Sequence, residues 1–196
     1  MKRRIVFATL LLAAAAAPAA AQTYRPRVSF EAWGGFALPW GEMADKVDMG
    51  YTLAGDLVLA LPGGLAAYAG YGYNRFSFES PVGLEQEVAG PEVGIRYHTG
   101  IDLLVVFPFE LWASTGITYL RPRALSDGDE VFADDRRLGV QGGVGMTSQL
   151  RHNFALSLGA QLGYMPGGDS STLDSCPPAD CPVSFATVRA ALSITP

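Results

Sequence analysis

The feature of this sequence that most constrains its fold is an alternation of large apolar residues with small or polar ones, repeated in eight segments. Successive side chains of a β-strand point to opposite faces, so this period predicts strands with two chemically different faces. The expected strands lie at 28–38, 51–61, 65–74, 92–97, 107–118, 137–146, 154–164 and 186–194. Gly interrupts nearly every stretch with helical spacing of apolar residues, so helices are not expected.

The face that carries the small and polar residues is the more informative one. In the first segment it carries Ser29, Glu31, Trp33 and Gly35, and elsewhere Gly, Ala and Ser dominate, with single charges. A soluble sandwich or barrel would need many more polar residues on its outer face. Small residues and isolated charges suit the narrow interior of an eight-stranded barrel whose aliphatic face meets lipid. The sequence therefore predicts an all-β, eight-stranded antiparallel up-and-down transmembrane β-barrel.

The connections between the segments alternate in length. Those at 39–50, 76–85, 120–135 and 165–183 are long, and those at 62–64, 98–102 and 148–151 are short. Outer-membrane barrels have this asymmetry, with long loops outside the cell and tight turns in the periplasm. Aromatic residues at the strand ends next to the long loops are expected to form a girdle at the membrane surface: Trp40, Tyr51, Tyr73, Tyr119 and Tyr164.

The first 21 residues have the layout of a secretory signal peptide. Lys2, Arg3 and Arg4 precede an apolar run over 5–17, and three alanines at 19–21 offer a cleavage site. We therefore expect a cleaved signal peptide at 1–21 and a barrel domain at 22–196, located in the bacterial outer membrane. The acidic balance of the chain, a formal net charge of -5, argues against a nucleic-acid partner.

Strand parity also turns several charged residues toward the lumen. Four acids and three bases nearly cancel, as an enclosed site requires, so we expect one charge network that fills the barrel. Its expected members are Glu31, Asp56, Glu92, Arg96, Glu110, Arg137 and Arg189.

Two sequence segments add a resemblance to a known family. Phe30-Glu31-Ala32-Trp33-Gly34-Gly35, followed by Pro39 and Gly41, and the later Gly50-Tyr51-Thr52-Leu53-Ala54-Gly55 resemble the small outer-membrane β-barrel family that includes OmpA-, OmpX- and OmpW-type proteins. The resemblance covers essentially the whole chain after residue 21. It implies outer-membrane lipids and lipopolysaccharide as surroundings, the barrel assembly machinery as a partner during insertion, and an external partner that the sequence does not identify.

Enzymatic and metal-binding functions are not expected. His98 and His152 both fall in short turns, and neither forms the His-x-Ser pair of the deacylase barrels that this family includes. The acidic residues at 126–130 and 134–135 do not match a calcium loop, and solvated loop charge explains them better. Cys176 and Cys181 are expected to form a disulfide in the last external loop, because export places them in an oxidising compartment. No cofactor is expected.

Two functions fit these features. The first is an integral outer-membrane barrel with a structural or surface-interaction role and a lumen plugged by side chains. The alternative is a narrow channel or transport route for small solutes, which the small diameter of an eight-stranded barrel disfavours. A soluble secreted barrel is a third possibility.

Overall fold

The computed structural model describes residues 27–45, 47–78, 83–102, 109–126, 128–133, 135–151, 153–167 and 182–196. The strands are β1 (Val28–Pro39), β2 (Gly50–Ala60), β3 (Leu65–Ser77), β4 (Leu84–Asp102), β5 (Phe109–Ser126), β6 (Asp129–Ala133), β7 (Arg137–Arg151), β8 (Phe154–Met165) and β9 (Val183–Ile194). Two short 3-10 turns, η1 (Gly41–Met43) and η2 (Pro62–Gly64), follow β1 and β2. No helix among the described residues is long and apolar enough to cross a bilayer.

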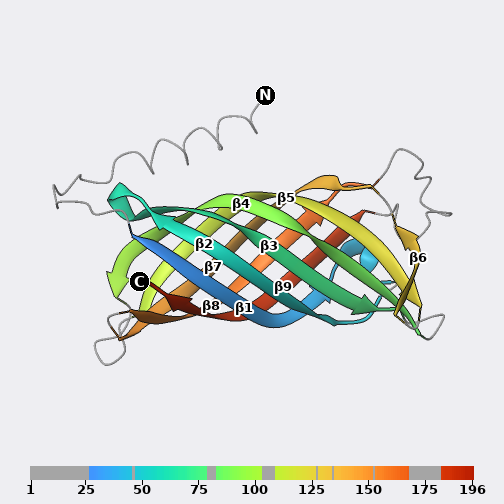
Figure 1. Ribbon diagram of the computed structural model, residues 1–196, viewed down its shortest axis with the longest axis horizontal. Coiled ribbons are helices and arrows are strands. Elements are labelled where there is room, and N and C mark those ends of the chain that lie inside the picture. Colours follow the sequence, from blue (N-terminus) through green and yellow to red (C-terminus); the bar gives the residue numbers. More distant parts are fainter. Residues whose placement is uncertain are drawn as a thin grey trace.

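Eight of these strands close into a single antiparallel barrel (Figure 1). Each pairs with its neighbours in chain order, and β1 pairs with β9, so that Phe30 lies opposite Ile194. The ninth strand, β6, pairs with the end of β5 and lies at one end of the barrel. The predicted fold class, an eight-stranded antiparallel transmembrane barrel, is confirmed.

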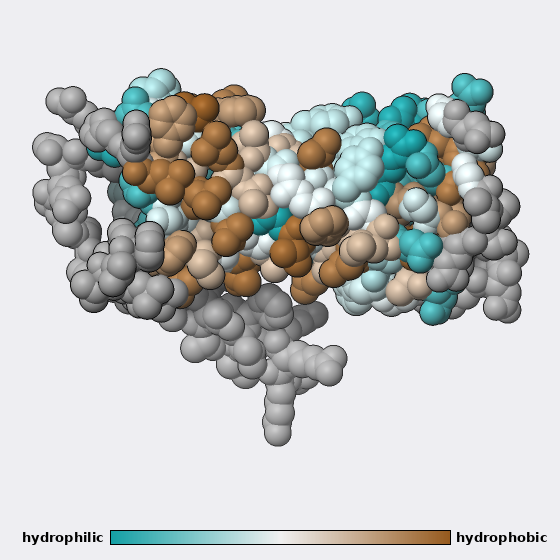
Figure 2. Space-filling model, turned by 90° about the horizontal axis from the view of Figure 1, so that it is seen from below, coloured by the Kyte–Doolittle hydropathy of each residue, from teal (hydrophilic) through white to brown (hydrophobic). Residues whose placement is uncertain are grey.

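The two faces of the strands separate as parity predicts. On β8, for example, Leu156, Leu158 and Leu162 are exposed, whereas Ser157 and Gln161 between them are buried in the lumen. Hydrophobic residues predominate on the outer surface over the half of the barrel nearer the η2 turn, on the left of the view in Figure 2. Large apolar side chains exposed on the outer surface include Phe30, Phe36, Leu53, Leu57, Ile95, Ile117, Val140, Val144, Val188 and Leu192. This surface is the lipid-facing belt.

Glycines on the inner face make room for large side chains from neighbouring strands. A Cβ atom at Gly145 would lie 2.3 Å from the Trp112 ring, and one at Gly159 would lie 2.7 Å from the same ring. Since such contacts are shorter than atoms tolerate, the narrow lumen holds its bulky residues only because their neighbours lack side chains. This packing explains why the inner face is rich in Gly.

The barrel has two different ends. At the short-turn end, β2 meets β3 through η2, where Gly63 and Gly64 have positive φ. At the long-loop end, β1 leads to β2 through η1, and hydrophilic residues gather on the outer surface (Figure 2). The described chain begins and ends at the short-turn end, with β1 and β9.

Strands extend into two of the connections expected to be long loops. β3 continues to Ser77 and β4 starts at Leu84, so that both ends of the expected loop at 76–85 are paired. The expected loop at 120–135 contains the end of β5 and all of β6. The physical reason is that Ser126 pairs with Asp129 beside Gly128, whose positive φ suits a hairpin between segments of alternating residues. β4 and β7 also run on to Asp102 and Arg151, through segments expected to be turns.

Some predictions concern residues outside the described ranges. These are the signal peptide at 1–21, the disulfide between Cys176 and Cys181, and the turn position of His152. They remain predictions.

Candidate functional site

The interior of the barrel contains an ion pair between β1 and β4. Nη1 of Arg96 lies 2.9 Å from both carboxylate oxygens of Glu31 and donates to them. The indole Nε1 of Trp33 also donates to Oε2 of Glu31, at 3.1 Å. The side chains of Arg96 and Glu31 are only 2% and 7% exposed, so the attraction between them is little screened by water.

Aromatic rings surround the two buried guanidinium groups. The Arg96 group lies 4.7 Å from the ring centre of Trp112, 5.5 Å from Trp33 and 5.7 Å from Tyr68. The Arg189 group, from β9, lies 4.5 Å from Trp33. Because cation–π attraction strengthens when water is excluded, these rings compensate part of the cost of burying two cations.

Two further carboxyl groups lie beside this pair, above glycines of β3. Asp56 is fully buried, and a Cβ atom at Gly70 would lie 2.0 Å from its Oδ1. The Glu92 carboxylate lies over Gly72, where a Cβ atom would be 3.7 Å from Oε2 of Glu92. Nε2 of Gln141 donates to Oε2 of Glu92 at 2.8 Å and lies 3.1 Å from the Tyr68 hydroxyl. We call Glu31, Asp56, Tyr68, Glu92, Arg96, Gln141 and Arg189 the lumen cluster.

Between the lumen cluster and the long-loop end lies a small polar hollow of about 20 Å³. This is about the volume of one water-sized sphere. Its lining residues include Thr52, Asn74, Gln161 and Thr187, together with Glu92 of the lumen cluster. A solute larger than water does not fit in it.

An apolar cluster fills the interior at the long-loop end. Met43 of η1 and Val47 fold inward and pack with side chains from the ends of the strands. The ring centres of Phe76 and Phe185 are 6.1 Å apart within this cluster. Its buried members are Ala37, Met43, Val47, Phe76, Val88, Leu120, Met165, Val183 and Phe185. They close the described part of the lumen above the polar hollow.

Five of the seven residues expected in one charge network come together in the lumen cluster, and two do not. Oε2 of Glu110 lies 3.4 Å from Nδ1 of His98, near the short-turn end. Arg137 lies at the start of β7, near the long-loop end, and donates to the Pro166 carbonyl. The seven do not all lie at one level, because strand parity gives the face of a residue but not its depth along the barrel.

Two residues that interlock the cluster, Tyr68 and Gln141, were not expected there. Parity places both on the inner face, but an uncharged side chain gives no sequence signal for a partner in the lumen. The glycines at positions 94 and 116 make room for the Tyr68 hydroxyl, which lies within hydrogen-bonding distance of Gln141.

The five expected girdle residues all lie toward the long-loop end. Trp40, Tyr51, Tyr119 and Tyr164 are exposed, and Tyr73 is half-buried. The Tyr51 and Tyr73 rings are 5.9 Å apart, and Arg136 lies over the Tyr119 ring at 6.0 Å.

Beyond the girdle, the extended strands carry a ladder of charged side chains on their outer face. Arg75 pairs with Glu85, and Arg123 pairs with both Glu87 and Glu130. Arg121 also reaches Glu130, at 3.6 Å. We call these six residues the outer ladder; all but Glu87 are partly exposed.

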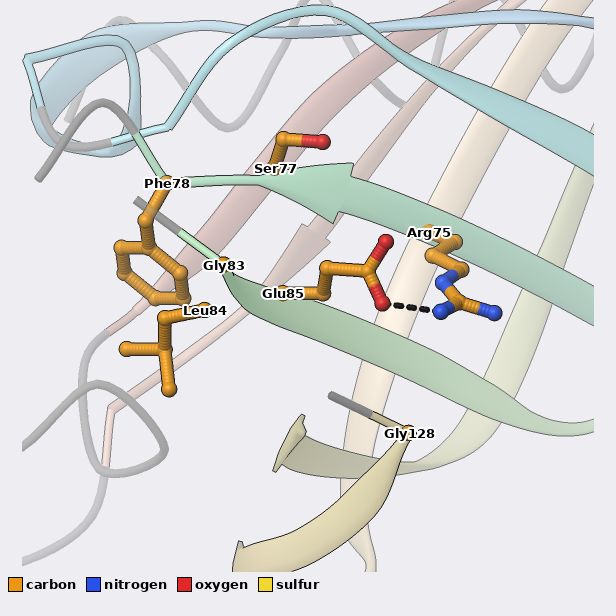
Figure 3. Close-up of a pocket in the computed structure, with 7 residues that line it drawn as sticks. All are labelled: Arg75, Ser77, Phe78, Gly83, Leu84, Glu85 and Gly128. Carbon is orange, nitrogen blue, oxygen red and sulfur yellow. Dashed lines mark hydrogen bonds and ion pairs between the residues drawn. The ribbon is translucent and has the colours of Figure 1, made fainter. Parts of the chain in front are cut away.

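A hollow of about 510 Å³ lies at the tip of the two extended hairpins (Figure 3). The Arg75–Glu85 pair lines one part of it, and the neighbouring side chains of Phe78 and Leu84 line another. Gly128, from the turn between β5 and β6, lies across from them. The hollow therefore offers a neutralised polar part beside an apolar part.

The described residues form no metal centre. No group of three or more His, Cys, Asp or Glu side chains within the described ranges is placed to hold a metal ion.

Comparison with known proteins identifies the fold but not a sequence family. No family model matches the chain, and no curated protein matches it. Among solved structures, Neisserial surface protein A is similar over 85% of this chain and 96% of its own, with 11% identity and a TM-score of 0.62. The N-terminal β-barrel domain of Pseudomonas aeruginosa OprF is similar over 87% of this chain and 100% of its own, with 13% identity and a TM-score of 0.50. The outer membrane protein AlkL, solved in lipid bilayers, covers 91% of both chains, with 13% identity and a TM-score of 0.43.

Proposed function

We propose that this chain is an integral protein of the bacterial outer membrane with a structural and surface-interaction role, and that it does not conduct solutes. The proposal includes cleavage of residues 1–21, a periplasmic short-turn end and an external long-loop end. The family resemblance stated above and the likeness in fold to Neisserial surface protein A support this placement.

The filled lumen supports the proposal that the protein does not conduct solutes. The lumen cluster occupies the centre, the apolar cluster around Phe76 and Phe185 closes the long-loop end, and the hollow between them is about 20 Å³. A path for ions or nutrients would require both the lumen cluster and the apolar cluster to rearrange. The lumen cluster includes buried charges that are costly to separate. A stable plug is therefore favoured over the alternative, a narrow channel.

The long-loop end supplies the surface for interaction. The strand extensions β3–β4 and β5–β6 carry the outer ladder and the hollow of about 510 Å³ away from the lipid-facing belt. Paired strands hold these side chains in place better than a loop would, so a partner meets a preformed surface. Lipopolysaccharide and lipid head groups are the nearest molecules, and the barrel assembly machinery would act during insertion.

Planar-bilayer recording of the purified, folded protein tests the plug. We expect no conductance steps above the bare bilayer. A double variant that opens the apolar cluster, Phe76→Ala with Phe185→Ala, is the matched control for detecting a path if one is created. Regular conductance steps of the unmodified protein would instead establish the channel function.

Epitope tags test the orientation. A tag inserted after Gly128, at the tip of the β5–β6 hairpin, should bind antibody on intact cells. A tag after Gly63, in the η2 turn, should bind antibody only after the outer membrane is permeabilised. The opposite labelling pattern would contradict the proposed topology.

A further inference from the structure

The lumen cluster contains one more negative than positive group. Its carboxyl groups are Glu31 from β1, Asp56 from β2 and Glu92 from β4, and its guanidinium groups are Arg96 from β4 and Arg189 from β9. All five side chains are buried. An uncompensated charge in such a site is costly, so the cluster must gain one positive charge or lose one negative charge.

The hydrogen bonds locate the excess charge. Glu31 receives three donor contacts, from Arg96 and Trp33, and is thereby satisfied. Arg189 is left to face Asp56 and Glu92 together, and it interacts electrostatically with both. One guanidinium charge cannot neutralise two carboxylates, so the imbalance belongs to Asp56 and Glu92.

The contacts of Asp56 are the decisive observation. Neither of its oxygens meets a hydrogen-bond donor among the described residues, and Oε1 of Glu92 also lacks one. The strand register brings the two residues together, because Asp56 lies opposite Gly70 on one side of β3 and Glu92 lies opposite Gly70 on the other. Two ionised carboxylates only accept hydrogen bonds, whereas a protonated carboxyl group donates one.

We propose that Asp56 and Glu92 share one bound proton, so that the pair carries a single negative charge that Arg189 neutralises. The proton forms the hydrogen bond between the two carboxyl groups and removes the repulsion that two ionised groups would suffer. The remaining groups that face the pair are Glu31 with its partner Arg96, and the uncharged Tyr68 and Gln141. With one proton bound, the lumen cluster is electrically neutral.

The surroundings of Asp56 and Glu92 favour a proton over a metal cation as the compensating charge. Gly70 and Gly72 let the two carboxyl groups settle against the barrel wall, and a Cβ atom at Gly70 would overlap Asp56. The neighbouring hollow is lined by Arg189 as well as by Glu92, which disfavours a second cation there. A sodium ion would also need several oxygen ligands around it, in the manner of other hard cations.

Infrared spectroscopy of the full-length barrel, folded in lipid vesicles at neutral pH, tests the proposal. We expect a carbonyl band of a protonated carboxyl group that shifts in heavy water. The band should disappear in Asp56→Asn and in Glu92→Gln, because each substitution leaves one ionised carboxylate that Arg189 neutralises. It should persist in the control Glu130→Gln, which removes an exposed carboxylate of the outer ladder and leaves the charge of the lumen cluster unchanged.

Equilibrium unfolding supplies a second measurement. Asp56→Asn should keep or raise the unfolding midpoint, because the amide donates to Glu92 as the protonated acid does. Glu31→Gln should lower the midpoint, because it leaves the Arg96 charge without its partner. Absence of the band in the unmodified protein, or an equal loss of midpoint in Asp56→Asn and Glu31→Gln, would overturn the proposal.

Discussion

The lumen cluster and the outer ladder are both built from arginines and carboxylates, but they differ in how far these charges are removed from water. The Arg96–Glu31 side chains are nearly inaccessible, whereas those of Arg121 and Glu130 are 43% and 41% exposed. Exposed ion pairs contribute little because water and salt screen them, whereas a buried pair leaves a costly charge when one partner is removed. Pairs of arginine and carboxylate therefore stabilise the barrel in the lumen cluster and contribute little to its stability in the outer ladder.

The surroundings of the charges differ in the same sense. In the lumen, Trp33, Trp112 and Tyr68 fix the guanidinium groups, and glycines of the neighbouring strands fix the rings. In the outer ladder, the Arg75–Glu85 and Arg121–Glu130 pairs are open to water, and only Glu87, the partner of Arg123, is nearly inaccessible. A substitution in the lumen must therefore disturb several strands, while one at the Arg121–Glu130 pair affects only the β5–β6 hairpin.

Arg96→Ala is the strongest test of this difference. The substitution leaves Glu31 buried without its ion-pair partner and empties the space between Trp112 and Tyr68. We expect a loss of about 3–5 kcal/mol in the free energy of unfolding, measured by equilibrium denaturation in detergent or lipid. A loss below about 1 kcal/mol, the range of an exposed ion pair, would mean that the lumen is hydrated and would contradict the comparison.

The glycines of β7 test whether the packing of the lumen is as tight as the glycine contacts indicate. A Cβ atom at Gly145 would lie 2.3 Å from both the Leu158 carbonyl and the Trp112 ring, whereas one at Gly142, on the lipid face, would lie 3.7 Å from its nearest neighbour. We expect Gly145→Ala to destabilise the barrel by about 1–3 kcal/mol through overpacking. Gly142→Ala is the matched control and should be close to neutral in the same denaturation experiment. Equal effects would show that the lumen relaxes freely.

The inner and outer faces of the strands were predictable from the sequence, because parity is a local property. Leu158 and Ser157 illustrate this: their order along β8 alone assigns one to lipid and the other to the lumen. Depth was not predictable, since it depends on strand tilt and on where each strand ends. Glu110 and Glu92 have the same parity, but Glu110 lies at the start of β5 and Glu92 in the middle of β4, so they meet different partners.

The extended hairpins were missed for a related reason. A search for alternating apolar residues finds the part of a strand that faces lipid, and it stops where charged residues such as Arg121 and Arg123 replace the aliphatic ones. In the extensions the pattern inverts, because the outer face carries the charges of the outer ladder while the inner face carries apolar residues such as Phe76, Val88 and Leu120. The turn around Gly128 was the remaining signal for the β5–β6 hairpin.

Arg121→Ala is the smallest expected effect and completes the comparison with Arg96→Ala. Arg121 lies 3.6 Å from Glu130, and the two side chains are 43% and 41% exposed. Glu130 keeps its contact with Arg123 when Arg121 is removed. We therefore expect a loss of at most about 1 kcal/mol, which should shrink further at high salt because exposed pairs are screened. The Arg96→Ala loss should change little with salt in parallel measurements. If Arg121→Ala costs as much as Arg96→Ala, the outer hairpins are coupled to the barrel core, and the surface proposed for partner binding contributes to the stability of the whole fold.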